Sequence, residues 1–156
     1  MSAEGGLVSR AADLWLALER RALIPRDDTI ETLSRVRDAG LKIGLISDCS
    51  HPLPEVWPDT PFARLIDVPV FSCEIGVRKP DPRIYHLACK RLGIPPEHCL
   101  YVGDGGSHEL TGASRAGMRA VLLRAREEER HQPVRYNADV WHGPSVSTLS
   151  EIIRLL

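Results

Sequence analysis

Residues 99–109 read CLYVGDGGSHE, an apolar run that ends in a glycine and an aspartate. The run at 99–102 is short and apolar, which predicts a strand. Asp104 follows this run closely, and Glu109 comes after a glycine-rich turn. In open parallel sheets, ligands bind beyond the C-terminal ends of the strands. A strand that delivers acidic side chains into a turn therefore indicates a ligand site.

On either side of this stretch, helical and strand patterns alternate along the chain. Asp28 should cap one of the helices, with Glu31 completing a capping box. Residues 49–61 contain four prolines and are expected to form a loop. The alternation predicts an α/β fold, a three-layer Rossmann-like parallel sheet with helices on both faces. Helices are expected at 7–23, 29–39, 82–92, 108–116 and from about 148, and strands at 41–46, 68–73, 99–102, 120–123 and 138–141.

The composition of the 156-residue chain is that of an ordinary globular protein, with 43% hydrophobic residues, 26% charged residues and a net charge of -1. This balance argues against nucleic acid or an anionic membrane as a partner. Apolar runs are too short to span a bilayer and residues 1–10 do not read as a signal peptide, so we expect a cytoplasmic protein. The cysteines show no zinc-binding spacing and are expected to be reduced, buried thiols: Cys49, Cys73, Cys89 and Cys99.

Polar stretches follow three of the expected strands, at residues 47–48, 74–82 and 103–109. The C-terminal ends of parallel strands share one edge, so the Ser47 hydroxyl, the Lys79 amine and the acidic pair should converge there. A hydroxyl and backbone N–H groups can donate to phosphate oxygens, and a lysine offsets phosphoryl charge. Carboxylates are the hard ligands that Mg²⁺ prefers. These residue types at one edge of the sheet, called the rim below, therefore predict a phosphate and magnesium site.

Each of these residues has a purely structural interpretation when taken alone. Ser47 fits a turn, Lys79 a solvated surface position, and Asp104 a turn or helix cap. Residues 103–106 also fit a tight turn, and they match a dinucleotide-binding loop poorly because the spaced third glycine is missing. Their order on successive strands is what favours a joint site.

These motifs together resemble those of the haloacid dehalogenase-like (HAD) hydrolase superfamily, over about residues 20–156. Residues 43–48 resemble its second motif, an apolar strand that ends in Ser or Thr, although Asp48 stands where Asn is usual. Residues 78–85, RKPDPRIY, closely resemble its lysine motif. Residues 101–118 resemble its acidic fourth motif, with His108-Glu109 in place of the usual Asn-Asp. The resemblance implies a HAD-like core fold.

The resemblance also implies a role for each site residue. Ser47 and the backbone N–H of Asp48 would bind the transferring phosphoryl group. Lys79 would be catalytic, orienting the nucleophile and stabilising phosphoryl charge. Asp104 would hold Mg²⁺, and Glu109 would hold it weakly through water. The implied reaction is attack by an aspartate on a phosphoryl group, followed by hydrolysis of the aspartyl-phosphate.

The implied function is therefore a Mg²⁺-dependent phosphatase that acts on a small phosphorylated metabolite. Dehalogenation also occurs in this family, but its dehalogenases generally do without Mg²⁺, so Asp104 and Glu109 favour phosphate chemistry. A different class of function stays open: a non-catalytic protein that binds phosphate or metal, or that serves in assembly. The unusual residues Asp48, His108 and Glu109 favour such divergence.

The family's nucleophile lies in a first motif, Asp-x-Asp after the central strand, and these 156 residues contain no Asp-x-Asp. Residues 1–24 resemble the last helix of a cap domain, and residues 25–156 resemble the core without its first strand. We therefore expect the cap to be mostly absent and the chain in this form to be inactive or crippled. An altered strand order, a second copy in a homodimer or another strand-completing partner would fill the slot between the flanking strands.

Overall fold

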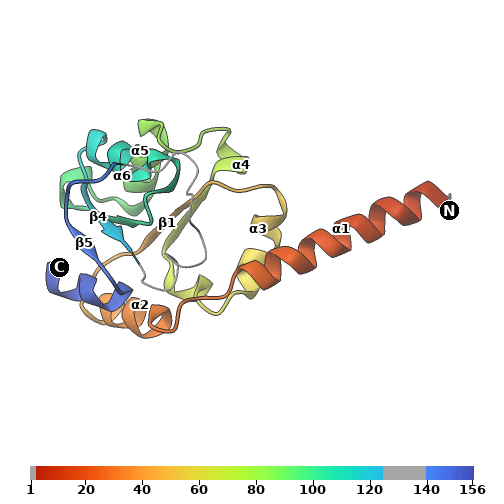
Figure 1. Ribbon diagram of the computed structural model, residues 1–156, viewed down its shortest axis with the longest axis horizontal. Helices are drawn as coiled ribbons and strands as arrows, with labels where there is room; N and C mark the ends of the chain where they lie inside the picture. The colour runs from red at the N-terminus through yellow and green to blue at the C-terminus, as the bar shows by residue number, and fades with distance from the viewer. Residues whose placement is uncertain (1–2, 125–139) are drawn as a thin grey trace.

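The computed structural model describes residues 3–124 and 140–156, which form helices around parallel strands (Figure 1). The α-helices are α1 (Ala3–Ala22), α2 (Thr29–Asp38), α3 (Pro52–Val56), α4 (Ser72–Ile75), α5 (Pro82–Leu92) and α6 (Glu109–Arg115). The 3-10 helices are η1 (Trp57–Asp59), η2 (Ala63–Leu65), η3 (Pro96–His98), η4 (Gly106–His108) and η5 (Leu149–Leu155). No helix in the described part of the chain is long and apolar enough to cross a bilayer.

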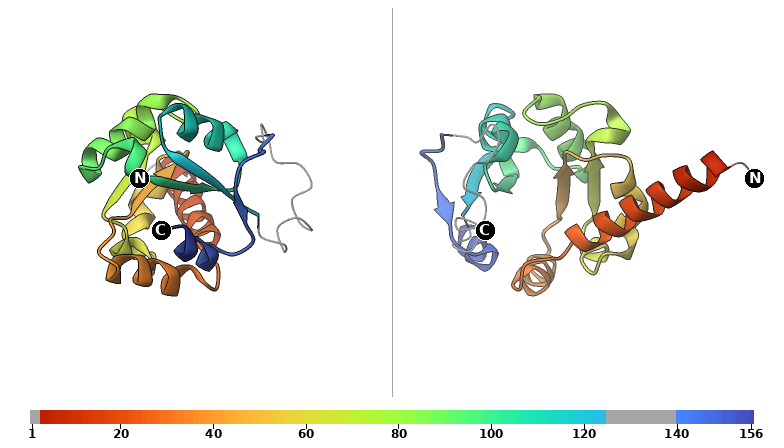
Figure 2. Two further views of the ribbon diagram at one scale, coloured as in Figure 1. Left: turned by 90° about the vertical axis from the view of Figure 1, so that its left-hand side faces the viewer. Right: turned by 45° about the vertical axis from the view of Figure 1, so that its right-hand side comes forward.

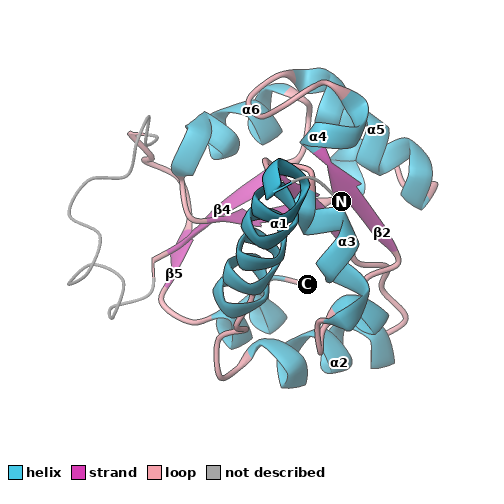
Figure 3. Ribbon diagram, turned by 90° about the vertical axis from the view of Figure 1, so that its right-hand side faces the viewer, coloured by secondary structure: helices cyan, strands magenta, loops and turns pink. Residues whose placement is uncertain are grey.

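Within the described residues, all strand pairs are parallel and belong to two sheets. One sheet pairs β1 (Gly44–Ser47) with β2 (Val68–Phe71). The other has the order β3 (Leu100–Gly103), β4 (Arg119–Leu123), β5 (Ser145–Val146). Helices α5 and α6 cover one side of the strands, and α2 with η5 lies on the other (Figures 2 and 3). The predicted α/β class, with helices on both faces, is confirmed.

No backbone pairing joins the two sheets anywhere in residues 3–124 or 140–156. β1 lies nearer than β2 to the second sheet, and β5 is the outer strand of that sheet (Figure 2). β1 and β3 are half-exposed, whereas β4 is buried after its first residue. The sequence predicted β1 as a buried strand, and that prediction was wrong because, among the described residues, β1 has a pairing partner on only one edge.

Helix α5 shows the start and stop signals that the sequence predicted. The Asp81 carboxylate accepts a hydrogen bond from the Arg83 N–H at 2.9 Å, and Pro82 occupies the first turn, where its missing N–H has no helical partner to lose. Gly93 ends the helix in the left-handed region, at φ 70°. One face of α5 is buried against β1 and β2. The helix thereby fixes the loop that precedes it, which carries Lys79.

Within residues 49–61, which the sequence predicted as a loop, residues 52–59 are helical. The helix α3 is followed directly by η1. Its prolines, Pro52 and Pro54, fall in the first turn, where backbone N–H groups lack helical acceptors in any case. Burial of Val56 and Trp57 in an apolar cluster with Phe71 stabilises this segment.

Three further expectations are corrected. Asp28 makes no side-chain cap for α2; its Oδ2 accepts a hydrogen bond from the Ser150 N–H at 2.8 Å and so joins α2 to η5. The C-terminal helix is a 3-10 helix. Of the strand expected at 138–141, residues 138–139 lie outside the described residues, residues 140–141 form no strand, and β5 lies further on.

Helix α1 projects from the rest of the molecule (Figure 1). The last turns of α1 pack against the α3 region, where Leu16 and Leu23, which follows the helix, meet the cluster around Trp57. Leu7 and Leu14 are each 67% exposed. The assignment of residues 1–24 to a cap remnant and of residues 25–156 to the core stays a prediction.

Candidate functional site

The candidate site residues lie at the C-terminal ends of two strands and at the start of a helix. Ser47 ends β1 and Asp48 follows it, while Asp104 follows β3. Glu109 is the first residue of α6, and Lys79 lies in the loop between α4 and α5. Hydrogen bonds bring Asp48, Lys79 and Glu109 together, and the roles assigned to the site residues stay predictions.

A buried ion pair connects the lysine loop to α6. Lys79 Nζ lies 2.6 Å from Glu109 Oε2, and the two side chains are only 13% and 6% exposed. The Tyr101 hydroxyl donates to the same Oε2 at 2.8 Å, and the Gly105 N–H donates to Oε1 at 3.1 Å. Both carboxylate oxygens are therefore engaged, as a buried charge requires.

A second contact connects β1 to the lysine loop. Asp48 Oδ1 accepts a hydrogen bond from the Lys79 N–H at 3.0 Å. An asparagine has a carbonyl oxygen at the same position, so Asp48 keeps the acceptor that the usual family residue offers. Among the described contacts of Lys79 and Glu109 none involves Ser47, which the structure places at the same strand end without joining it to the ion pair.

Two glycines make the close approach of these elements possible. A Cβ atom at Gly103 would lie 2.6 Å from Glu109 Cδ, so only glycine leaves room for the carboxylate beside β3. A Cβ atom at Gly112 on α6 would lie 2.9 Å from the Pro80 carbonyl oxygen. Gly112 therefore allows the lysine loop to rest on α6.

Tyr101 is a site residue that the sequence reasoning did not single out. Burial, followed by the charge of Glu109 and the hydrogen bond to it, raises the pKa of Tyr101, so the phenol stays protonated and donates to the carboxylate. Tyr85 on α5 also contacts Glu109, because the Tyr85 hydroxyl donates to the Glu109 carbonyl oxygen at 2.9 Å. The available signal was spacing: Tyr101 and Gly103 are two residues apart on a strand and share a face.

The side chains at the rim fit the predicted metal site only in part. The exposed Asp104 carboxylate accepts the Gly106 N–H at 2.8 Å. One such carboxylate fits Mg²⁺, which keeps several waters and takes only one or two side chains. Glu109 is already engaged, and in the described part of the chain no three His, Cys, Asp or Glu side chains are grouped to hold a metal. The metal-binding roles of Asp104 and Glu109 stay predictions.

The loop between Asp104 and Glu109 has an uncommon backbone. Ser107 and His108 both have positive φ, at 55° and 51°, a region that costs an L-residue roughly 1–2 kcal/mol. Such backbone strain persists where the surrounding structure fixes it, and it clusters at functional sites. Here it directs the chain from the end of β3 into α6.

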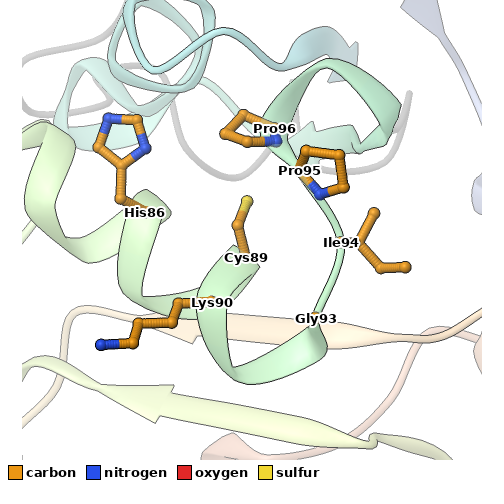
Figure 4. Close-up of a pocket in the computed structure, with 7 residues that line it drawn as sticks. All are labelled: His86, Cys89, Lys90, Gly93, Ile94, Pro95 and Pro96. Atoms are coloured by element: carbon orange, nitrogen blue, oxygen red, sulfur yellow. The ribbon is translucent and has the colours of Figure 1, made fainter.

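A pocket elsewhere on the molecule is separate from this rim. It is lined by His86, Cys89, Lys90 and residues 93–96, at the C-terminal end of α5 (Figure 4). Lys79 precedes the N-terminal end of α5, and a helix of 11 residues is about 16 Å long. The pocket therefore contributes nothing to the candidate site.

Comparisons with known proteins agree on one family. A family model described as haloacid dehalogenase-like hydrolase matches residues 2–117. A glyceraldehyde 3-phosphate phosphatase of Methanopyrus kandleri is 36% identical over 133 residues, which are 83% of this chain and 56% of that protein. An (S)-2-haloacid dehalogenase of Pseudomonas fluorescens is 37% identical over 83 residues, which are 53% of this chain and 37% of that protein.

A solved structure shows the same likeness in three dimensions. A HAD phosphatase from Thermococcus onnurineus has 26% sequence identity and a TM-score of 0.73, over 90% of this chain and 63% of that chain. The chain spans about half the length of the curated relatives it matches.

Proposed function

The chain belongs to the haloacid dehalogenase-like hydrolase family, and on that premise we propose that its rim binds the phosphoryl group of a small phosphorylated metabolite for Mg²⁺-assisted hydrolysis. The observation that carries the proposal is the connected set Asp48, Lys79 and Glu109, in which β1, the lysine loop and α6 meet. The phosphatases among its relatives support the substrate class.

Each residue has a distinct task in this proposal. The Ser47 hydroxyl and the N–H of Asp48 donate to phosphoryl oxygens at the end of β1. Lys79 supplies positive charge, and Glu109 holds the ammonium in place while the Tyr101 hydroxyl donates to the same carboxylate. Asp104 holds Mg²⁺, which supplies charge neutralisation on the phosphoryl oxygens when it is bound.

The nucleophile needs a carboxylate that these residues do not offer. At the rim, Asp48 accepts the Lys79 N–H, Glu109 is paired with Lys79, and Asp104 is assigned to the metal. We propose that a strand-completing partner placed between β1 and β3 supplies the attacking aspartate, because a second copy of these 156 residues would bring no Asp-x-Asp. The 156 residues alone are then expected to bind phosphate without turnover.

A second candidate is metal-independent hydrolysis of a carbon–halogen bond. Both oxygens of Glu109 are engaged within the protein, so of the two predicted metal ligands only Asp104 has an exposed carboxylate. A site with one such ligand favours a reaction that needs no metal. Chloride release from 2-chloropropionate in the presence of EDTA would support it, and no release from a chain that binds orthophosphate would favour the phosphatase.

The proposed function is tested with an aryl phosphate and Mg²⁺, on the purified chain and on Asp104→Asn. The expected result is no turnover by either protein, together with orthophosphate binding that Lys79→Met abolishes. Turnover that Asp104→Asn removes would show that a carboxylate within the chain attacks, which overturns the proposed inactivity and keeps the phosphatase. A folded chain with neither turnover nor phosphate binding would overturn the function itself.

A further inference from the structure

The four cysteines are free and lie as two pairs. The Sγ atoms of Cys49 and Cys73 are 3.6 Å apart, and those of Cys89 and Cys99 are 3.8 Å apart. Only Cys89 is buried and the other three are half-buried, so the expected burial holds for Cys89 alone, and the expected reduced state stays a prediction. Because each pair brings two thiols together, either pair could form a disulfide.

We propose that Cys49 and Cys73 form a reversible disulfide on exposure to a hydroperoxide, and that this bond fastens the exit of β1 to α4. This inference is independent of the proposed function, because it concerns a covalent bond between two thiols. It assigns a modification site beside the candidate site, since Cys49 follows Asp48 and α4 leads into the lysine loop.

Hydrogen bonds hold the backbone of Cys49 beside that of the residue before Cys73. The Cys49 N–H donates to Ser72 Oγ at 2.9 Å, and the Ser72 hydroxyl donates to the Cys49 carbonyl oxygen at 3.4 Å. Ser72 precedes Cys73, so one side chain fixes the spacing of both cysteines. To reach the ~2.0 Å length of a disulfide, the sulfurs must approach by roughly 1.5 Å, which rotation about the Cα–Cβ bonds can provide.

The second pair is protected from the same reaction. Cys89 is 3% exposed, and its side chain is directed toward Pro95 and Pro96 (Figure 4). Burial, followed by the proximity of Cys99, raises the pKa of Cys89 to about 12. The thiolate is the reactive form of cysteine, so Cys89 should be inert near neutral pH.

Cys49 and Cys73 are less protected, though not highly reactive. Both residues are half-buried at the edge of the apolar cluster around Trp57. Burial, followed by the hydrogen bond with Cys73, raises the pKa of Cys49. The reaction therefore starts from a small thiolate fraction and should be slow, with an excess of oxidant needed to complete it.

The chemistry balances in two steps. The Cys49 thiolate attacks one oxygen of the hydroperoxide, an S–O bond forms, the O–O bond breaks, and hydroxide or alkoxide leaves and is protonated. The Cys73 thiolate then attacks the sulfenic sulfur, the S–S bond forms, the S–O bond breaks, and the hydroxyl group leaves as water. The two thiols lose two electrons and two protons, and the hydroperoxide is reduced.

The test uses the double variant Cys89→Ala/Cys99→Ser, which retains only the proposed pair. After treatment with hydrogen peroxide, the monomer should lose two hydrogen atoms in intact mass and show no free thiol in denaturant. Dithiothreitol should restore both thiols. The oxidised form should melt several degrees higher, because the bond closes the loop from residue 49 to residue 73.

The matched control is Cys49→Ser/Cys73→Ser, which retains only the second pair and should keep both thiols under the same treatment. Peptide mapping of the oxidised unmodified chain gives the answer without substitutions, as a linked pair of peptides containing Cys49 and Cys73. Unreacted thiols, sulfinic acid in place of the bond, or bonds between chains would overturn the proposal. Equal oxidation of the control variant would overturn its selectivity.

Discussion

At the scale of single residues, the ion pair between Lys79 and Glu109 is the interaction on which the candidate site depends most. Both side chains are nearly buried, so removal of one partner leaves a charge that has lost its counterion. Lys79→Met should lower the free energy of unfolding by about 3 kcal/mol. The double variant Lys79→Met/Glu109→Gln should recover part of this loss, since no buried charge remains.

Urea unfolding of the two variants and the parent chain measures this prediction. The double variant should have a higher midpoint than Lys79→Met alone. An equal loss of unfolding free energy in both variants would mean that the Glu109 carboxylate is stable without the lysine. The ion pair would then contribute little to stability.

The left-handed backbone at Ser107 gives a second residue-scale prediction. Ser107→Gly should stabilise the chain by up to about 1 kcal/mol, because glycine adopts positive φ without a steric cost. The greater conformational entropy that glycine gives the unfolded chain offsets part of this gain. The control Ser34→Gly, in the middle of α2, should destabilise it by about 0.5 kcal/mol. Thermal melts with the same sign for both variants would show that Ser107 is not strained.

Most site residues could be named from the sequence, but their contacts could not. Ser47, Lys79 and Asp104 follow or flank predicted strands, so the rule for parallel sheets places them at one edge. That Glu109 turns inward onto Lys79 and Tyr101 depends on the space left by Gly103, which is a packing property. The Cys49 and Cys73 contact joins segments 24 residues apart and has no local signal.

At the scale of elements, the approach of the lysine loop to α6 rests on Gly112. Gly112→Ala places a Cβ atom 2.9 Å from Pro80 Cβ and from its carbonyl oxygen, so the loop or the helix must shift. We expect a loss of about 1–3 kcal/mol in stability and weaker phosphate binding through displacement of Lys79. Gly6→Ala in α1 meets no atom within 4 Å and should leave binding unchanged while adding helical content.

Calorimetry and circular dichroism of both variants check this prediction. If Gly112→Ala binds orthophosphate as tightly as the parent chain, the lysine loop does not depend on the close contact with α6.

The element boundaries show where sequence patterns are sufficient. α5 was predicted within its observed limits because a cap, a first-turn proline and a terminal glycine all agree. The helical character of residues 52–59 was missed because prolines in a first turn look like loop residues when the buried partners of Val56 and Trp57 are unknown. Asp28 caps a helix distant in sequence, which no local pattern encodes.

At the scale of the whole molecule, the division into two sheets is the main feature. The family resemblance led us to expect a slot beside β1 and β3, and the structure has no pairing between the sheets in its described part. Amides in β1 and β3 should therefore exchange with deuterium faster than those in β4, which has partners on both sides.

Hydrogen–deuterium exchange with mass spectrometry measures this difference on peptides that cover residues 44–47, 100–103 and 119–123. A strand-completing partner should slow exchange in the first two and leave the third unchanged. Equal protection of all three in the free chain would mean that β1 and β3 are paired in solution.

The most direct test of the account is an NMR titration of the chain with orthophosphate in the presence of Mg²⁺. The account predicts that backbone amide shifts cluster at residues 47–48, 79 and 103–104, and that Lys79→Met removes them while the fold is retained. Shifts confined to other parts of the molecule, or none in a folded chain, would contradict the assignment of this rim as a phosphoryl site.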